Sequence, residues 1–194
     1  EKESITQCYF FEHQGQVYAN HCVYENKGEY NNCSAALSRL DLKAGALVNQ
    51  TTIKPPFPRQ LNEKNWVMFS HDGRIVCRYS IEPYVLLEID PESGQSSLLM
   101  KLDKAIDVPS SAAGPVYNST NPIVWDDDHY ITFIHQRFES LSPDDRNRLY
   151  LQYVLLIDRK TLAPVSFIPR PIITGGRESG RHRGVHYTMS LIVD

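Results

Sequence analysis

Few features of this sequence assign it at once to a class of protein. No apolar run approaches the roughly 20 residues that a transmembrane helix needs, so the sequence predicts no membrane span. An excess of one charge is also missing, because 20 Lys and Arg residues face 23 Asp and Glu residues, for a formal net charge of -3. A nearly neutral chain of this kind is not expected to be a general nucleic-acid binder.

Cysteine is scarce and irregularly spaced. The four residues are Cys8, Cys22, Cys33 and Cys77. Their spacing matches no zinc-binding pattern, so no metal is expected. In an oxidising compartment Cys22 can pair with Cys8 or with Cys33. Three glycosylation tripeptides favour a secretory or lumenal location but leave a cytoplasmic one open; they begin at Asn32, Asn49 and Asn118.

What is present is the composition of an ordinary globular protein. With 194 residues, 41% of them hydrophobic and 22% charged, the chain is predicted to form a single domain over residues 1–194. Strand signals dominate. Aromatic and β-branched residues of 8–24 lie on both sides of the Gln14-Gly15 turn, and a further strand is predicted over 35–42. The three prolines within 52–60 mark a loop.

The strands recur in units of about 45 to 50 residues, a period typical of propeller blades. Each unit has a strand, a tight turn rich in Asp or Gly, a second strand, a gap, and a third strand that ends in Asp (Asp41, Asp90 and Asp158). The sequence therefore predicts an all-β fold of the β-propeller class. A β-sandwich would supply similar strands but not this repeated order. The blade-like units cover residues 7–42, 63–90, 115–158 and 184–194.

These units are too few for a closed ring. About three and a half to four blades do not complete a propeller of five. The sequence is therefore expected to be part of a longer protein, or to gain a blade from its termini or from a partner chain or a second copy.

Polar residues beside the inner strands are the candidates for a binding site, because propellers bind ligands at the mouth of the central channel. Lys64 and Asn65 precede the second unit, His135 and Tyr150 lie in the third, and Arg183 precedes the fourth. Their ammonium, amide, imidazole, phenol and guanidinium groups suit phosphate or sugar hydroxyls.

Short motifs over nearly the whole chain resemble one known family. They are EKNWVMF and YSIEP in the second unit, NSTNPIVWDDDHYITFIHQ and YLQYVLLID in the third, and PRPII and RGVHYTMSLIVD further on. Together they are similar to the five-bladed propellers of glycoside hydrolase family 130, which include mannoside phosphorylases, hydrolases and mannosyltransferases. The resemblance implies phosphate or sugar binding by Lys64, Asn65, His135 and Tyr150. It also implies inorganic phosphate as a co-substrate, with no other cofactor.

One departure from the family pattern affects the chemistry. The family begins a strand with Asp-x-Arg, in which the Asp is the general acid and the Arg contacts the sugar. In the matching stretch, TQCYFF, Gln7 stands at the acid position and Tyr9 at the Arg position. Glutamine has no proton to donate, so the acid step cannot run from this residue and the catalytic residues stay unknown.

Each candidate also has a purely structural interpretation. Lys64 and Asn65 can protect a strand edge against sheet-to-sheet pairing. His135 and Tyr150 fit an ordinary strand interior, and Arg183 lies in a basic stretch that is equally typical of a solvated loop.

Three further features also have both a functional and a structural interpretation. Glu82 either contacts sugar hydroxyls or only fixes the turn before Pro83. Trp66 can stack on a sugar ring, although Trp is more often a core residue. The acidic triplet of residues 126–128 resembles a calcium loop, but it lacks the spaced ligands and the distal Glu of such a loop, so a hairpin turn is favoured.

The sequence thus favours a carbohydrate-active enzyme, similar to a glycoside phosphorylase, hydrolase or glycosyltransferase, acting on an oligosaccharide or a glycosyl phosphate. The alternatives are a propeller that binds sugar without catalysis and a module whose face binds protein. In the first case a single displacement is expected, with the anion held by Lys64, Asn65 and His135 around a shared hollow.

Overall fold

The computed structural model describes residues 4–27, 30–60, 63–107, 114–139, 148–174 and 190–191, and these residues form strands, turns and loops with no helix. They belong to two compact units. The first consists of Glu1–Ser80 and Tyr84–Lys101, and the second of Ile81–Pro83 and Leu102–Asp194. The single domain expected over residues 1–194 remains a prediction.

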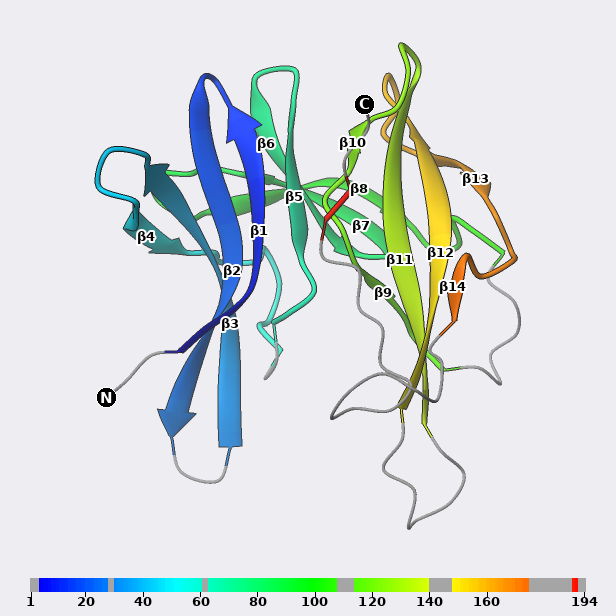
Figure 1. Cartoon of the computed structure of the whole chain (residues 1–194), viewed down its shortest axis with the longest axis horizontal. Helices are drawn as coiled ribbons and strands as arrows, with labels where there is room; N and C mark the ends of the chain where they lie inside the picture. Colours follow the sequence, from blue (N-terminus) through cyan, green and yellow to red (C-terminus); the bar gives the residue numbers. More distant parts are fainter. Residues whose placement is uncertain are drawn as a thin grey trace. The chain divides into compact units, whose positions relative to one another are not determined.

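The first sheet is an antiparallel meander of four strands in chain order. Its strands are β1 (Ser4–His13), β2 (Gln16–Lys27), β3 (Tyr30–Asp41) and β4 (Ala46–Thr52) (Figure 1). The predicted turn at Gln14-Gly15 joins β1 to β2, and both residues have positive φ (50° and 76°), as a tight hairpin turn requires. Strand β3 begins before residue 35, because its pairing with β2 continues to Lys27 and Tyr30.

The second sheet repeats this arrangement. Its strands are β5 (Val67–His71), β6 (Arg74–Ser80), β7 (Tyr84–Ile89) and β8 (Ser96–Leu102), again in chain order. A turn at Asp72-Gly73, of the Asp- and Gly-rich kind that the repeat predicts, joins β5 to β6 with φ values of 47° and 74°. Strand β7 is buried at five of its six positions, which is why it has no polar alternation in the sequence.

The third sheet lies in the second unit. Its main path is β10 (Ile123–Val124), β11 (His129–Glu139), β12 (Arg148–Asp158) and β13 (Pro164–Phe167). Strand β9 (Val116–Asn118) also pairs with β11, and β14 (Ile173–Thr174) pairs with β12. The pairing of β11 with β12 runs without a register shift from His129 opposite Asp158 to Glu139 opposite Arg148.

The Asp residues that end the third strands perform one local task in all three sheets. The side chain of Asp41 accepts backbone hydrogen bonds from residues 43 and 44. Asp90 accepts one from the backbone of residue 92 and one from the hydroxyl of residue 93, and Asp158 accepts them from residues 160 and 161. Each Asp thereby fixes the turn into the next strand. These hydrogen bonds also lower the pKa of all three carboxyl groups.

A fourth strand follows each of these turns, and the sequence did not predict it. Strands β4, β8 and β13 have mostly exposed or half-buried residues, so they lack the apolar alternation by which a strand is recognised. The all-β class is confirmed, with two four-stranded meanders and a six-stranded sheet among the described residues. The five-bladed propeller and its closure remain predictions, and most of the unit expected at 184–194 lies outside the described residues.

The core of the first unit lies between its two sheets. It consists of Ala35, Leu37, Ile53, Trp66, Met68, Ile75, Cys77, Val85, Leu87 and Ile89. The ring of Tyr79 makes edge-to-face contacts with Trp66 and Phe57, at centroid distances of 4.8 and 4.9 Å. Trp66 is only 4% exposed, so the core interpretation of this residue holds.

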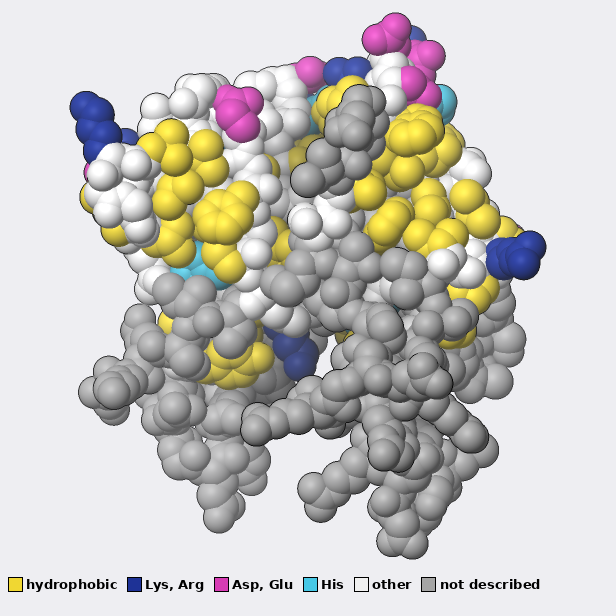
Figure 2. Space-filling view, viewed as in Figure 1, with side chains coloured by type: hydrophobic (Ala, Val, Ile, Leu, Met, Phe, Trp, Pro, Cys, Tyr) yellow, Lys and Arg dark blue, Asp and Glu magenta, His cyan; other side chains and the backbone are white. Residues whose placement is uncertain are grey.

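Apolar side chains also reach the surface in both units (Figure 2). The large exposed ones are Phe10, Leu42, Leu98, Val124, Trp125, Val165, Ile168 and Ile172. No helix among the described residues is long and apolar enough to cross a membrane.

Gly94 connects the two sheets of the first unit and gives a first prediction. Its carbonyl accepts a hydrogen bond from the Lys54 backbone at 2.8 Å, its φ is +69°, and an added Cβ would collide with the carbonyl of Thr52. We expect Gly94→Ala to destabilise the first unit by about 2 kcal/mol, because strain and steric overlap add. Urea denaturation followed by Trp66 fluorescence measures this, with Gly45→Ala as control, where φ is +61° but the space around the Cβ is open. An equal effect at both glycines would show that backbone strain alone is responsible.

Candidate functional site

Two residues that the sequence singled out separately lie side by side in the first unit. Gln7 donates from Nε2 to Oδ1 of Asn65 at 3.0 Å, across 58 positions of sequence. Gln7 lies where the register of β1 against β2 shifts, with φ 51°, and Asn65 precedes β5 with φ 60°. This irregularity of β1 re-aims the Gln7 side chain, whose amide reaches Asn65 in the segment before β5. Gln7 and the EKN motif thus belong to one cluster.

A further amide and a carboxylate belong to this cluster. Asn20 donates from Nδ2 to the carbonyl of Trp66 at 2.9 Å, while its Oδ1, also buried, has no hydrogen-bond donor among the described residues. Glu63 is 3% exposed and accepts from the backbone N–H of Gln60 at 2.7 Å. Its carboxylate also interacts with the hydroxyl of Tyr79. Burial is the main cause that raises the pKa of this hydroxyl, and the Glu63 carboxylate raises it further. Glu63 is therefore a buried structural acceptor.

Two thiols complete the cluster. Cys22 Sγ lies 3.2 Å from Oε1 of Gln7, and both Cys22 Sγ and Cys33 Sγ approach the carbonyl oxygen of Glu63, at 3.8 and 3.4 Å. The backbone N–H of Asn65 donates to the Cys22 sulfur. We call the set of Gln7, Asn20, Cys22, Cys33, Glu63, Lys64 and Asn65 the first polar cluster. The sequence missed the contribution of the cysteines because their spacing carries no motif.

Lys64 is the exposed member of the first polar cluster. Its charge acts on both thiols and helps to lower the pKa of Cys33. An exposed ammonium beside buried amides can attract an anion and leave the amides to bind its hydroxyl groups.

The second unit has its own buried cluster around His135, which is 2% exposed. The imidazole lies between the rings of Tyr117 and Tyr150, with centroid distances of 5.4 and 5.3 Å and interplanar angles of 30° and 33°. Ser119 Oγ lies 2.9 Å from His135 Nδ1 and donates to Oε1 of Gln152, also at 2.9 Å. We call these five residues, with Arg137, the second polar cluster. Period-2 alternation along 117–119, 135–137 and 150–152 is the signal that would have grouped them.

The second polar cluster holds a neutral imidazole. Burial, with a smaller effect of the Arg137 charge, lowers the pKa of His135 to about 3. The Ser119 hydroxyl donates to Gln152, so its hydrogen is not directed at Nδ1 of His135, as it is in a serine nucleophile activated by histidine. At neutral pH His135 can therefore act as a neutral hydrogen-bonding group but not as a cation for phosphate.

The predicted site residues are divided between the two units. Lys64 and Asn65 belong to the first, and His135 and Tyr150 to the second, so their shared hollow remains a prediction. Glu82 is exposed in the turn between β6 and β7. Arg183 lies outside the described residues.

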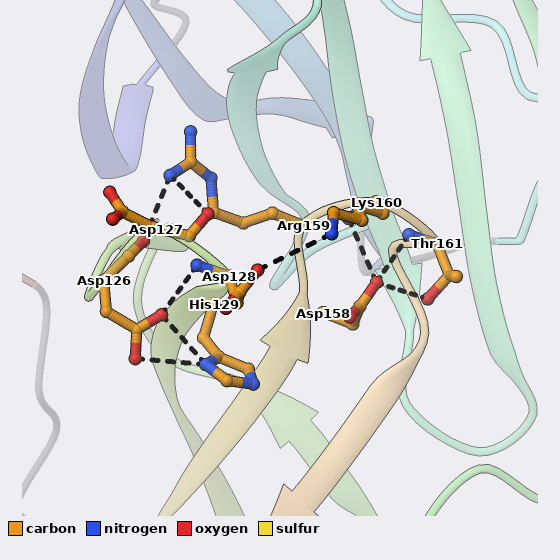
Figure 3. Close-up of polar contacts among 8 residues, drawn as sticks. All are labelled: Asp126, Asp127, Asp128, His129, Asp158, Arg159, Lys160 and Thr161. Atoms are coloured by element: carbon orange, nitrogen blue, oxygen red, sulfur yellow. Dashed lines mark hydrogen bonds and ion pairs between the residues drawn. The ribbon is translucent and has the colours of Figure 1, made fainter.

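The acidic triplet at the tip of the β10–β11 hairpin is held by hydrogen bonds (Figure 3). Asp126 accepts from the backbone of Asp128 at 2.9 Å and contacts Nδ1 of His129 at 2.9 Å. Arg159 Nη1 donates to the carbonyls of Asp126 and Asp127 at 3.0 and 3.1 Å. Among the described residues there is no cluster of His, Cys, Asp and Glu that can hold a metal ion. The favoured hairpin-turn interpretation accounts for the triplet.

A cavity of about 300 Å³ lies in the second unit between residues 105–107 and strand β13. Its walls are Ala105, Ile106, Asp107, Pro164, Val165, Ser166, Phe167 and Pro169. None of the predicted site residues that the structure describes lines this cavity.

The described residues therefore define an all-β protein built from antiparallel meander sheets, with a buried polar cluster in each unit. No protein-family model matches the chain, and no curated protein matches it. Among solved structures, it is similar to a mannose phosphorylase from Leishmania mexicana, determined in complex with a phosphate ion. The identity is 10%, the TM-score is 0.41, and the match covers 84% of this chain and 67% of that one. A match this distant does not establish the family.

Proposed function

We propose that the protein recognises a mannoside-type carbohydrate together with phosphate, through the first polar cluster, in a glycoside phosphorylase-like role. The observation that carries the proposal is the hydrogen bond between Gln7 and Asn65. The family resemblance marks these two positions independently, one as the acid position and one as a phosphate ligand. Their direct contact supports a common site.

The chemistry of the cluster fits this ligand. Planar amide groups donate and accept at once, as sugar hydroxyls require. The Oδ1 of Asn20, buried without a donor among the described residues, leaves an acceptor for a hydroxyl or a bridging water. Lys64 supplies the positive charge for a phosphate at the exposed side.

A second candidate, sugar binding without turnover, is favoured by the state of Gln7. Its amide is held on both sides, by Cys22 at Oε1 and by Asn65 at Nε2. An amide in this position cannot protonate a leaving group. Turnover would then need a different acid, whereas binding would not.

Isothermal titration calorimetry with inorganic phosphate, mannose 1-phosphate and mannobiose tests the proposal. We expect mannose 1-phosphate to bind, and Lys64→Ala to weaken binding about fivefold, the loss of roughly 1 kcal/mol that one exposed charge can provide. Lys43→Ala, an exposed lysine in the β3–β4 turn of the same unit, serves as the control and should bind normally. Absence of binding by all three compounds would refute the proposal.

The two candidate functions predict different results for a variant that has a carboxylic acid at position 7. Gln7→Asp places a carboxyl group at the family's acid position. If the site is phosphorylase-like, release of phosphate from mannose 1-phosphate with an acceptor sugar should rise above that of the natural protein. A variant that still binds but stays inactive would support binding without turnover.

A further inference from the structure

The two thiols of the first polar cluster form a pair that no motif announced. Cys22 lies opposite Ala35, and Cys33 lies opposite Tyr24, in the β2–β3 register. The two cysteines are thus diagonal neighbours on one face of the sheet. Their sulfur atoms approach the same carbonyl oxygen, that of Glu63, at 3.8 and 3.4 Å, so the two thiols converge on one point.

The surroundings of the pair favour a thiolate on one of the two sulfurs. The hydrogen bond from Cys22 lowers the pKa of the Cys33 thiol, and the charges of Lys64 and Arg59 lower it further. The same hydrogen bond raises the pKa of Cys22. The Cys33 thiol of the pair therefore loses its proton more easily than an ordinary cysteine, and the Cys22 thiol loses its proton less easily. Thiolate formation beside cations is what distinguishes reactive cysteines from inert buried ones.

We infer that Cys22 and Cys33 are a modification site at which a small-molecule disulfide closes a reversible protein disulfide that weakens ligand binding at the first polar cluster. The effect on binding rests on the proposed function, whereas disulfide formation does not. The Cys33 thiolate attacks the small-molecule disulfide, which releases one thiolate and leaves a mixed disulfide. Cys22, as its thiolate, then attacks Cys33 Sγ and releases the second thiol. Two protein thiols are oxidised, and one small-molecule disulfide is reduced to two thiols.

The contacts show why closure affects the site. The Cys22 thiol contacts Oε1 of Gln7, and both thiols contact the carbonyl of Glu63. A disulfide has no S–H hydrogen, so these donors are lost. Diagonal Cα atoms lie about 7–8 Å apart, whereas a disulfide joins Cα atoms about 4.4–6.8 Å apart. Closure must therefore also shift β2 along β3 and disturb their pairing next to Glu63.

The other cysteines serve as internal controls. Cys77 is completely buried in the core, and burial raises the pKa of its thiol. Burial also raises the pKa of Cys8. Neither is expected to compete as a nucleophile. Cys8 is only half-buried, whereas Cys22 and Cys33 are buried, at 4% and 0% exposure, so the reaction of the pair requires local opening.

The experiment treats the full chain with oxidised glutathione and digests it without reductant. Mass spectrometry is expected to find a peptide linked through Cys22 and Cys33, with Cys8 and Cys77 still reduced. Affinity for mannose 1-phosphate is expected to fall about tenfold on oxidation and to recover with dithiothreitol. Cys33→Ser should abolish this response, and Cys8→Ser should retain it.

Separate outcomes distinguish the two proposals. Absence of the linked peptide, or a linked peptide with unchanged affinity, would overturn the switch. If the reduced protein does not bind mannose 1-phosphate, the proposed function fails. Hydrogen exchange of the Glu63–Trp66 segment in the reduced and oxidised proteins then tests whether the disulfide changes the first polar cluster. Faster exchange in the oxidised protein would support the switch, and unchanged exchange would overturn it.

Discussion

Replacing Arg78 by alanine is expected to destabilise the first unit by about 3–5 kcal/mol. Arg78 lies in β6 and is completely buried, and burial lowers the pKa of its guanidinium to about 10. It is hydrogen-bonded to the hydroxyl of Tyr84, whose pKa burial raises to about 12. The substitution removes a large packed side chain and leaves this hydroxyl buried without its donor, so a cavity cost and an unpaired polar group add.

Urea denaturation followed by the fluorescence of Trp66, which is buried in the same unit, measures the change. Arg74→Ala is the matched control on the same strand. Arg74 is 38% exposed and pairs with Glu88 at 3.6 Å, so its loss should cost less than about 1 kcal/mol. Equal midpoints for the two variants would show that burial of Arg78 contributes nothing particular.

Acidification from pH 6.5 to pH 4.5 is expected to cost the second unit about 2 kcal/mol through His135 alone. The pKa of His135 is about 3 in the folded chain, against about 6.5 in an unfolded chain. Between these values the unfolded state binds a proton that the folded state does not. The stabilisation is therefore complete above about pH 6.5 and is lost progressively as the pH falls toward 3.

Hydrogen exchange of the β11 and β12 peptides measures the opening free energy at each pH. The window above pH 4.5 separates His135 from Asp126 and Asp158, because hydrogen bonds lower the pKa of these carboxyl groups and they titrate below it. His135→Gln should remove most of the slope, whatever it does to stability at pH 7. A slope of the same size in both proteins would place the pH dependence elsewhere.

The neutral state of His135 also bears on how the two units take part in ligand binding. The first polar cluster has an exposed cation at Lys64, whereas the cation of the second polar cluster, Arg137, lies over the ring of Tyr117, 5.9 Å from its centroid, beside a stack of rings and a neutral imidazole. Anion binding is therefore assigned to the first cluster in the proposed function. A sugar face packed against Tyr150 would be the chemically suitable role for the second.

Local signals in the sequence were sufficient for much of the fold. The turns at Gln14-Gly15 and Asp72-Gly73 were predicted because a tight hairpin needs residues that accept positive φ. The Asp residues that end the third strands were recognised as a repeat, and the structure gives each of them the same turn-fixing hydrogen bonds. Strands β4, β8 and β13 were missed, because edge strands with few buried residues have no distinctive pattern.

The sequence by itself determined the all-β class and the repeated order of strands and turns, and it marked Gln7, Lys64 and Asn65 as residues to compare with the family. Turn chemistry, side-chain alternation and short motifs all act within a few residues, so they can be recognised without the structure. Only the tertiary structure decided that Gln7 meets Asn65, that Cys22 and Cys33 converge on Glu63, and that His135 is neutral between two tyrosines. These features depend on a bulge, on strand register and on burial. All three are set by contacts between segments far apart in the chain, and no local pattern encodes them.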